Sequence, residues 1–502
     1  MESEASITNK TESLSSVFGS SLEADSFMEV NSFMQSEPFS PLSSPSTESA
    51  KSFSSVTSPC DSLLCSPYIE LDEKHFVNNN AMRMLNLYGR HIEANNLKRS
   101  GRDAFISHAR WLQQNYQELK VARLRLCFSN PSEYTNDAME WIRMATSRDV
   151  EELHIDFSIP DHDRRYPECF KSYAELPPDV YMLRDSLHTL RLSGCKFQPA
   201  LFGKFSALRK LSIERVEFDR ESLQVLVANC WHLEDLKLKM LGHLTNININ
   251  DFRHRIKRVT IEECIPLMEA NIVMPGLQYF RYSGIAVPIV IKDYYTIEEA
   301  ELDFSQQFEL GHHGGLISEI LICLQNARVL TVCSYLTRVI GSENLYLPTI
   351  IIQLRHLILM KATLHKDESA GIIFLLANYP KLETLTINMG YQTQLAPRIL
   401  SDEEYNFNTP FDAERFWEAQ TSPITCLDMY LKKVNILNFR GHKNEVHFLK
   451  YLLKKSARLE ELSITITSDM PDWENLQGSC ISAAKRLQHC EKASPIVQIA
   501  IR

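Results

Sequence analysis

The sequence predicts an α/β solenoid, in which short strands stack into a curved, mostly parallel sheet with helices on its outer side. A Leu-x-x-Leu-x-Leu pattern returns about every 20 to 30 residues between Leu124 and Ile464. The first core positions of five successive copies are Leu190, Leu211, Leu236, Val259 and Phe280. The steps between them are 21, 25, 23 and 21 residues. This period and this spacing are typical of leucine-rich repeats, which form stacked recognition surfaces rather than catalytic pockets.

Bulk composition agrees with a water-soluble protein that has a large core. The chain has 502 residues, of which 44% are hydrophobic and 23% charged. Its net charge is −10, and about −7 of that lies in residues 1–68, where nine acidic residues face only Lys10 and Lys51. The remainder is close to neutral and shows no basic stripe, which argues against sequence-independent binding of nucleic acid.

Residues 1–68 differ from the rest and are predicted to form a disordered, serine-rich acidic tail. They contain 21 serines and four Ser-Pro pairs, and they cannot bury enough apolar surface to offset the entropy cost of ordering. Within them, the stretch from Leu22 to Met34 alternates acidic and bulky apolar residues. It is either an interaction motif or a merely solvated segment. Because the first residues lack the apolar core of a signal peptide, the sequence predicts a cytoplasmic or nuclear protein.

The twelve cysteines include no Cys-x-x-Cys pair. In an intracellular protein they should be reduced thiols. Cys195, Cys230 and Cys264 follow predicted strands or end predicted helices, where a small buried hydrophobic side chain fits. Apolar runs such as Gly371–Ala377 are too short to cross a bilayer.

The predicted elements follow one another in a simple order. Residues 69–120 form a helical segment or cap, and a strand follows at 121–128. A helix spans 134–146, and the next strand begins near Leu153. In the middle repeats each strand is followed by a helix, as at 221–230 and 369–378, where apolar residues keep helical spacing. Leucine-rich repeats therefore occupy 121–400.

Each predicted strand places its leucines inward and the residue between them on the concave, solvent-facing side of the sheet. The polar residues of this row are the predicted protein-binding positions: His154, Arg191, Ser212, Lys237, Thr260, Arg281, Glu301, Thr331 and Thr386. Ile358 and Ser463 belong to the same row. Because the row mixes charges, it favours a protein ligand over a polyanion.

Sequence motifs for catalysis are missing. There is no phosphate-binding loop, dinucleotide fingerprint, zinc-protease motif or nucleophile elbow. The pairs His312-His313 and Glu403-Glu404 and the triplet Asp161-His162-Asp163 are interpreted as polar loops, with metal binding or catalysis as the weaker alternatives. The sequence therefore predicts no enzyme, no catalytic residue, no cofactor and no metal site.

The C-terminal segment carries a specific resemblance. It contains Trp417-Glu418, then Leu431-Lys-Lys-Val-Asn-Ile-Leu-Asn-Phe-Arg-Gly441, then Glu445 followed by Leu452-Leu453, and finally Leu459-Glu460. This series resembles the FBD domain of plant F-box/LRR proteins, and it implies an FBD domain over 401–502. Together with Trp141-Ile142 and Asn229-Cys230 further upstream, the resemblance covers about residues 105–502.

The spacing of apolar residues in this segment predicts one more repeat-like unit. Strands near Val434 and Leu462 flank an amphipathic helix over 445–456, and the unit can cap the open end of the solenoid. We expect Trp417 to be the aromatic side chain that anchors this domain on the last repeats.

Family members begin with an F-box, which binds the Skp-type adaptor of a ubiquitin ligase. The series that marks it, Leu-Pro followed by Ile-Leu and then by Leu-Ser and Arg-Trp, does not occur in residues 1–104, so the sequence predicts no adaptor binding. The resemblance implies a candidate substrate-recognition component of an SCF-type ubiquitin ligase. The alternatives are a partner-binding regulator, cytoplasmic or nuclear, that uses the repeat face and the acidic tail, and a diverged F-box paralogue or imperfect gene model. No motif identifies the protein ligand.

Overall fold

The computed structural model describes residues 66–117, 120–159, 174–196, 198, 201, 205–250, 255–292, 296–307, 312–343, 345, 353–390, 411–466 and 473–502. All of them belong to one compact unit, Thr57–Arg502. Residues 1–65 of the predicted tail, the triplet Asp161–Asp163 and the pair Glu403–Glu404 lie outside the described residues.

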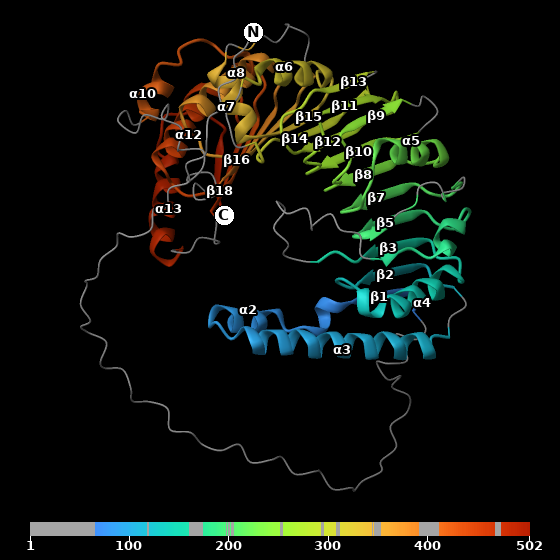
Figure 1. Ribbon diagram of the computed structural model, residues 1–502. Coiled ribbons are helices and arrows are strands. Elements are labelled where there is room, and N and C mark those ends of the chain that lie inside the picture. Colours follow the sequence, from blue (N-terminus) through green and yellow to red (C-terminus); the bar gives the residue numbers. More distant parts are fainter. Residues whose placement is uncertain are drawn as a thin grey trace, which may run out of the picture. The chain divides into compact units, whose positions relative to one another are not determined.

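A single parallel sheet of 15 strands runs through the described chain (Figure 1). Its strands, in spatial order, are β1 (Tyr68–Asp72), β2 (Arg123–Cys127), β3 (Glu152–Asp156), β5 (Thr189–Ser193), β7 (Lys210–Glu214), β8 (Asp235–Lys239), β10 (Arg258–Glu262), β12 (Tyr279–Ser283), β14 (Glu299–Asp303), β15 (Val329–Cys333), β16 (His356–Ala362), β17 (Thr384–Met389), β18 (Lys433–Phe439), β19 (Glu461–Ile466) and β20 (Gln498–Ile501). Leu190 pairs with Leu211 and Leu192 with Ile213 on neighbouring strands. The predicted leucine-rich-repeat solenoid is confirmed.

Helices connect many of the strands. They are α2 (Asn79–Leu87), α3 (His91–Asn115), α4 (Thr135–Thr146), α5 (Arg220–Asn229), α6 (Gly314–Cys323), α7 (Ser334–Ser342), α8 (Lys366–Asn378), α10 (Ala413–Glu418), α11 (Thr425–Met429), α12 (Lys443–Lys455) and α13 (Trp473–Leu487), with short 3-10 helices at η1 (Glu73–Phe76), η2 (Ser132–Tyr134) and η4 (Pro178–Met182). Figure 1 shows α4, α5 and α6 on one side of the strands. The helices predicted at 134–146, 221–230 and 369–378 are confirmed as α4, α5 and α8.

The middle repeats differ from the prediction. After β8, β10 and β12 the chain forms strands instead of helices: β9 (Asn246–Asn250), β11 (Glu269–Val273) and β13 (Ile289–Lys292), which pair in parallel as a second sheet. A shorter pair, β4 (Ala174–Glu175) and β6 (Cys195–Lys196), lies earlier in the chain. The reason is local, because Asn246-Ile-Asn-Ile-Asn250 alternates with period two and buries Ile247 and Ile249 on one face. A helix in these repeats was a wrong expectation.

The N-terminal end also departs from a purely helical segment. Residues 68–72 form β1, an additional strand that pairs with β2 and buries Ile69 and Leu71. The predicted helical residues follow it as α2 and α3. In the second half of α3, the ring of Phe105 lies 5.1 Å from Phe128 and 5.7 Å from Trp141, measured between centroids. These rings join α3 to β2 and α4.

A mostly buried arginine fixes α3 to the end of β2. The Nη1 atom of Arg102 donates to Glu73 Oε1 (2.9 Å) and to the carbonyl oxygen of Ser129 (2.8 Å). Its Nη2 donates to the carbonyl oxygen of Asn130 (2.7 Å), and its guanidinium lies 4.4 Å from the ring centroid of Phe128. Because every partner is charged, polar or aromatic, the buried charge is compensated.

Cysteines of the repeats are part of the core, as predicted. Cys195, Cys230 and Cys264 are buried, free thiols. Burial raises the pKa of Cys230 and of Cys264 to about 12, so both stay protonated and unreactive at neutral pH. Among the described residues, no helix combines the length and the apolar character that a membrane crossing requires.

The C-terminal unit, by which we mean the described residues from 411 to 502, continues the sheet. β18 and β19 are neighbours, and α12 between them confirms the predicted amphipathic helix. Trp417 on α10 is 3% exposed, which confirms its burial. The prediction placed it against the last repeats, whereas its ring contacts include Phe448 (4.8 Å) and Tyr451 (4.9 Å) of α12. Contact with the preceding repeat comes from α11, where Cys426 Sγ lies 3.1 Å from the carbonyl oxygen of Leu376 in α8.

Candidate protein-binding face

The predicted binding residues occupy one continuous row across the sheet. Each is the third residue of its strand, and register pairs it with the third residue of the neighbouring strand. The row runs His154, Arg191, Ser212, Lys237, Thr260, Arg281, Glu301, Thr331, Ile358 and Thr386. We call the side of the sheet formed by the first, third and fifth residues of its strands the open face.

The structure extends this row at both ends. Glu70 of β1 and Arg125 of β2 precede His154, and Asn435 of β18 stands between Thr386 and Ser463. The signal for Glu70 was present in Tyr68-Ile-Glu-Leu-Asp72, whose alternation is that of a strand. Asn435 likewise stands between Val434 and Ile436, both of which are buried.

Ion pairs tie the charged part of the row to its neighbours. Lys237 Nζ lies 2.7 Å from Glu262, and Arg281 lies 2.9 Å from both Glu262 and Glu301. Burial raises the pKa of the Glu301 carboxyl above its usual value, although the nearby Arg281 acts in the opposite direction. These ion pairs give this part of the face a fixed pattern of charge.

From β15 onward the third-residue row loses its charge. Thr331, Ile358, Thr386 and Asn435 follow one another there, and hydrogen bonds replace ion pairs. The Oγ1 atom of Thr386 lies 2.9 Å from His356 Nε2 and accepts from Asn435 Nδ2 at 3.2 Å. The mixed charge seen in the sequence is thus confined to the earlier strands of this row.

A hollow of about 440 Å³ lies on the open face over β3, β5, β7 and β8. Its lining consists of His154, Asp156, Arg191, Leu192, Ser193, Lys210, Leu211, Ser212, Glu214, Asp235 and Lys237. The structure therefore brings four of the predicted residues, His154, Arg191, Ser212 and Lys237, together in one concavity. The others, from Thr260 onward, continue the face beyond it.

The charged side chains of this hollow differ in whether they have partners among the described residues. Glu214 pairs with Lys239 at 3.0 Å, and Asp156 Oδ1 accepts hydrogen bonds from the backbone N–H and the hydroxyl of Ser158. By contrast, Arg191 and Lys210 are exposed and form no ion pair with any described residue. Burial lowers the pKa of His154, so its imidazole is neutral at neutral pH. With respect to the described residues, the hollow thus offers a ligand two unpaired cations, the unpaired carboxylate of Asp235 and a neutral imidazole.

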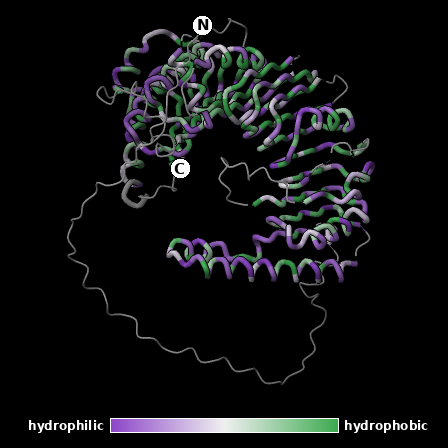
Figure 2. The backbone as a smooth tube through the Cα atoms, in the orientation of Figure 1, coloured by the Kyte–Doolittle hydropathy of each residue, from purple (hydrophilic) through white to green (hydrophobic). Residues whose placement is uncertain are grey.

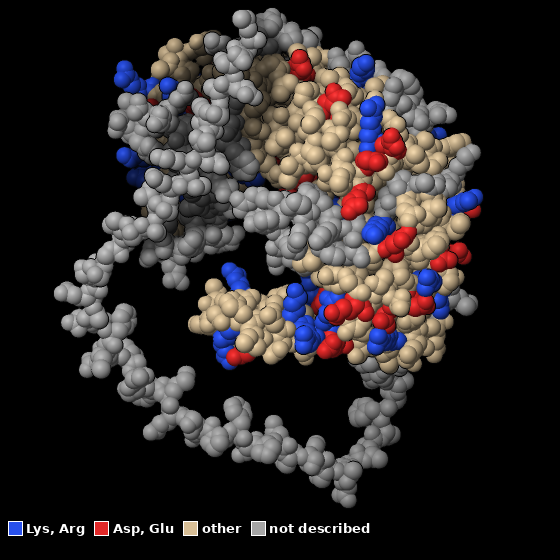
Figure 3. Space-filling model, viewed as in Figure 1, with Lys and Arg blue, Asp and Glu red and all other residues tan. Residues whose placement is uncertain are grey.

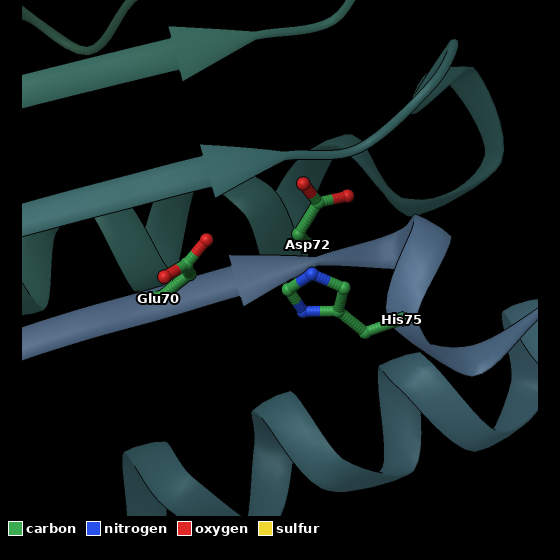
Figure 4. Close-up of side chains that lie close together, drawn as sticks. All are labelled: Glu70, Asp72 and His75. Carbon is green, nitrogen blue, oxygen red and sulfur yellow. The ribbon is translucent and has the colours of Figure 1, made fainter. Parts of the chain in front are cut away.

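At the N-terminal edge of the sheet, Glu70, Asp72 and His75 lie close together (Figure 4). One potential metal-ligand atom from each lies within 4.8 Å of the others. Arg125 already forms ion pairs with both carboxylates, at 3.2 Å for Asp72, and Asp72 also accepts from the Lys74 N–H at 3.0 Å. A metal ion would have to displace this guanidinium, so the cluster is best described as an ion-pair network.

His313, for which the sequence predicts a loop position rather than a metal-ligand role, immediately precedes α6. Its Nδ1 lies 2.7 Å from the Tyr335 hydroxyl. Within the described ranges, the group around Glu70 is the one set of three or more potential metal ligands that the fold brings together, and neither His312 nor His313 belongs to it.

Comparison with known proteins places most of this fold in a family. The family model described as "At1g61320/AtMIF1, LRR domain" matches residues 113–502. The chain is 26% identical over 371 residues to the F-box protein At3g62230 of Arabidopsis thaliana, which covers 72% of this chain and 77% of the relative. It is 22% identical over 348 residues to the FBD-associated F-box protein At1g61320 of the same plant, covering 65% and 69%. The family match starts near the end of α3 and includes the hollow and the C-terminal unit.

Proposed function

The chain belongs to the At1g61320/AtMIF1 LRR-domain family of plant F-box/LRR proteins, and on that premise we propose that it is a non-catalytic protein-recognition component. Its ligand is a protein that binds the open face, with its main polar contacts in the hollow over β3 to β8. The relatives' printed names describe F-box and FBD-associated proteins, and leucine-rich repeats generally present their ligand surface on the strand side.

The observation that carries this proposal is that some cations of the open face are paired with carboxylates of the described chain and others are not. Lys237 and Arg281 are held by Glu262, whereas Arg191 and Lys210 form no ion pair with a described residue. A guanidinium that keeps its donors free can bind a carboxylate through two parallel hydrogen bonds. We therefore propose that the ligand places an acidic side chain, or its C-terminal carboxylate, in the hollow.

A site-specific photo-cross-linker tests where the ligand binds. Placed at Ser212 in the hollow, it should capture a partner that the same cross-linker at Val225 does not, because Val225 lies on α5 and is 39% exposed outside the open face. The captured protein is then purified, and its affinity is measured for the wild-type chain and for Arg191→Glu/Lys210→Glu.

We expect the double variant to bind at least tenfold more weakly with an unchanged melting temperature, since both side chains are exposed. A loss of about tenfold corresponds to about 1.4 kcal/mol, within the range of a charge-assisted contact. Equal affinity for both proteins would show that the hollow is not the recognition site.

Within this function we propose the chain as a candidate substrate-recognition component of an SCF-type ubiquitin ligase. Support comes from the F-box names of its relatives. The rival proposal is a partner-binding regulator, in the cytoplasm or the nucleus, that acts through the open face and the acidic serine-rich residues 1–68. It is favoured by the absence of the Leu-Pro and Ile-Leu hallmarks from residues 1–104.

Co-expression with the Skp-type adaptor separates the two proposals. The sequence predicts that the full chain does not co-purify with the adaptor. A stable complex with the full chain would instead support the ligase role. Its loss on removing residues 1–65, a deletion that keeps β1, α2 and α3, would show that these residues hold a diverged F-box.

A further inference from the structure

Helix α2 is unusual because none of its residues is buried. Met84, Leu87 and Tyr88 have the i, i+3 and i+4 spacing of one helical stripe, and they are 49%, 72% and 73% exposed. Ile92 in the first turn of α3 is 78% exposed. Four large apolar side chains within nine residues thus face solvent, whereas isolated exposed apolar residues are ordinary.

The local backbone brings these side chains to the tip of a helical hairpin. Gly89 has a φ of +69°, which lets the chain reverse directly after α2. The Tyr88 N–H donates to the Met84 carbonyl (3.0 Å), and the Arg90 N–H donates to the Leu85 carbonyl (2.8 Å). α3 begins at His91 and runs back along α2 (Figure 1).

Only the second half of α3 joins the solenoid core. Phe105, Ile106, Ala109 and Leu112 are buried there. In the first half, Ala94 is buried and the other residues through Ser100 are exposed or half-buried. Figure 2 shows hydrophilic and hydrophobic segments alternating along both helices. The α2–α3 hairpin, defined as residues 79–100, therefore presents a surface that the described repeats do not cover.

The hairpin is basic in an acidic protein. Residues 79–100 contain Arg83, Arg90, Lys98 and Arg99 against the single carboxylate Glu93, an excess of three positive charges, while the whole chain carries −10. Arg90 pairs with Glu93. Arg83, Lys98 and Arg99 are exposed and form no ion pair with a described residue. Figure 3 shows blue basic side chains along the hairpin.

Basic and apolar positions are interleaved on the hairpin. Arg83 lies one turn from Leu87, and Ile92 and Arg99 are seven residues apart, so each pair shares a helix face. Such a surface matches a partner helix that has apolar residues on one side and carboxylates at its borders. A second copy of this chain is disfavoured as the occupant, because it would bring the same positive charges into contact.

We propose that the α2–α3 hairpin is a second docking site, which binds an acidic amphipathic helix of a partner protein through Met84, Leu87, Tyr88 and Ile92 and the unpaired cations beside them. The site lies outside the open face, so one chain can hold a ligand on the sheet and a second protein on the hairpin.

Two synthetic peptides of about 18 residues, or five helical turns, test this chemistry. Both carry a leucine stripe, and the remaining positions are glutamate in one and lysine in the other. Fluorescence anisotropy measures their binding to the full-length protein and to the variants Leu87→Ser/Ile92→Ser and Arg83→Glu/Arg99→Glu. Ile265→Ser/Met268→Ser is the matched control, because these two apolar side chains are also exposed, at 44% and 68%.

We expect the glutamate peptide to bind, and each hairpin variant to weaken its binding at least tenfold with an unchanged circular dichroism melting curve. The lysine peptide should not bind, and the control variant should match the wild type. Equal binding of the two peptides, or undiminished binding by Leu87→Ser/Ile92→Ser, would overturn the proposal. So would a dimer in sedimentation equilibrium that this variant abolishes, or binding to phosphatidylserine vesicles in place of the glutamate peptide.

Discussion

Trp417 shows how one side chain holds the C-terminal unit together. Its ring lies 5.0 Å from Phe416, 4.8 Å from Phe448 and 4.9 Å from Tyr451, so α10 and α12 share one aromatic cluster. Nothing in the described chain accepts a hydrogen bond from its Nε1. The contribution of Trp417 to stability therefore comes from packing and apolar burial.

Trp417→Ala should lower the free energy of unfolding by about 3–5 kcal/mol, as expected for removal of a fully buried aromatic ring. Urea unfolding followed by circular dichroism measures this change. Trp231→Ala is the control, because Trp231 is 53% exposed, and it should cost less than about 1 kcal/mol. Indistinguishable urea midpoints for the two variants would contradict the anchoring role.

Two buried glutamates occupy equivalent places in two repeats, those of β16 and β18, which the repeat of β17 separates. Glu368 Oε2 accepts from the N–H groups of Thr363 (2.9 Å) and Leu364 (2.7 Å) before α8. Glu445 Oε2 accepts from those of Arg440 (2.9 Å) and Gly441 (3.0 Å) before α12. Burial raises the pKa of both carboxyls above the usual glutamate value. The start of α12 thus has the same arrangement as the start of α8, two strands earlier in the sheet.

Glu368→Gln should remove a pH-dependent part of the stability. Because the pKa of Glu368 is raised by folding, the folded state binds more protons above about pH 4.3, and the free energy of unfolding falls as pH rises toward the raised value. Glutamine keeps an acceptor oxygen without the charge, so its variant should lose that decline. Glu368→Ala leaves the N–H groups unsatisfied and should cost about 1–3 kcal/mol.

Urea unfolding at several pH values checks both parts of this prediction. Glu445→Gln provides an internal comparison, because Glu445 accepts the same kind of backbone hydrogen bonds and burial raises its pKa in the same direction. Wild-type and Glu368→Gln curves with parallel pH dependence would show that the carboxyl titrates alike in the folded and unfolded chain.

At this scale, sequence reasoning located the third-residue row because strand side chains alternate with period two. It could not show that Arg281 pairs with Glu262 and Glu301 while Arg191 has no ion-pair partner in the part of the chain that the structure describes. Those contacts depend on the register between strands 20 or more residues apart and on side-chain conformation. Glu70 was missed because β1 precedes the first recognised leucine repeat.

At the scale of elements, helices α7 and α8 approach each other closely. A Cβ added to Gly371 would lie 1.9 Å from the carbonyl oxygen of Thr337, and one added to Gly341 would lie 1.8 Å from that of Asp367. No side chain fits between backbones at these distances. Each helix therefore depends on a glycine at the crossing point.

Gly371→Ala should separate the two helices and destabilise the protein by about 1–3 kcal/mol or more, through overpacking. The thermal midpoint should fall accordingly. Gly315→Ala in α6 is the matched control, because nothing lies within 4 Å of its added Cβ, and loss of unfolded-state entropy should leave that variant neutral or slightly more stable. A Gly371→Ala protein that melts like the wild type would refute the close crossing.

Element type was predictable where a segment was long and strongly periodic, as in α4, α8 and α12. It failed for β9, β11 and β13, each of four or five residues, since so short a segment follows its pairing partners rather than its own propensity. Asn246-Ile-Asn-Ile-Asn250 carried a period-two signal.

For the molecule as a whole, residues 1–65 contain most of the net charge. If they form the predicted serine-rich tail, deleting them should leave the thermal midpoint of the remaining chain unchanged and move its isoelectric point upward from about 5.9. Differential scanning calorimetry and isoelectric focusing measure the two quantities. A lower melting midpoint would show that the segment contributes to the folded unit.

The second sheet, formed by β9, β11 and β13, affects the order in which parts of the protein unfold. Repeats in a solenoid are coupled mainly to their nearest neighbours, and here the repeats of β8, β10 and β12 are hydrogen-bonded on both sides of their core. Opening one of them breaks two sets of bonds at once. Local melting that begins at either end should slow on reaching these repeats, and their amides should exchange with deuterium last.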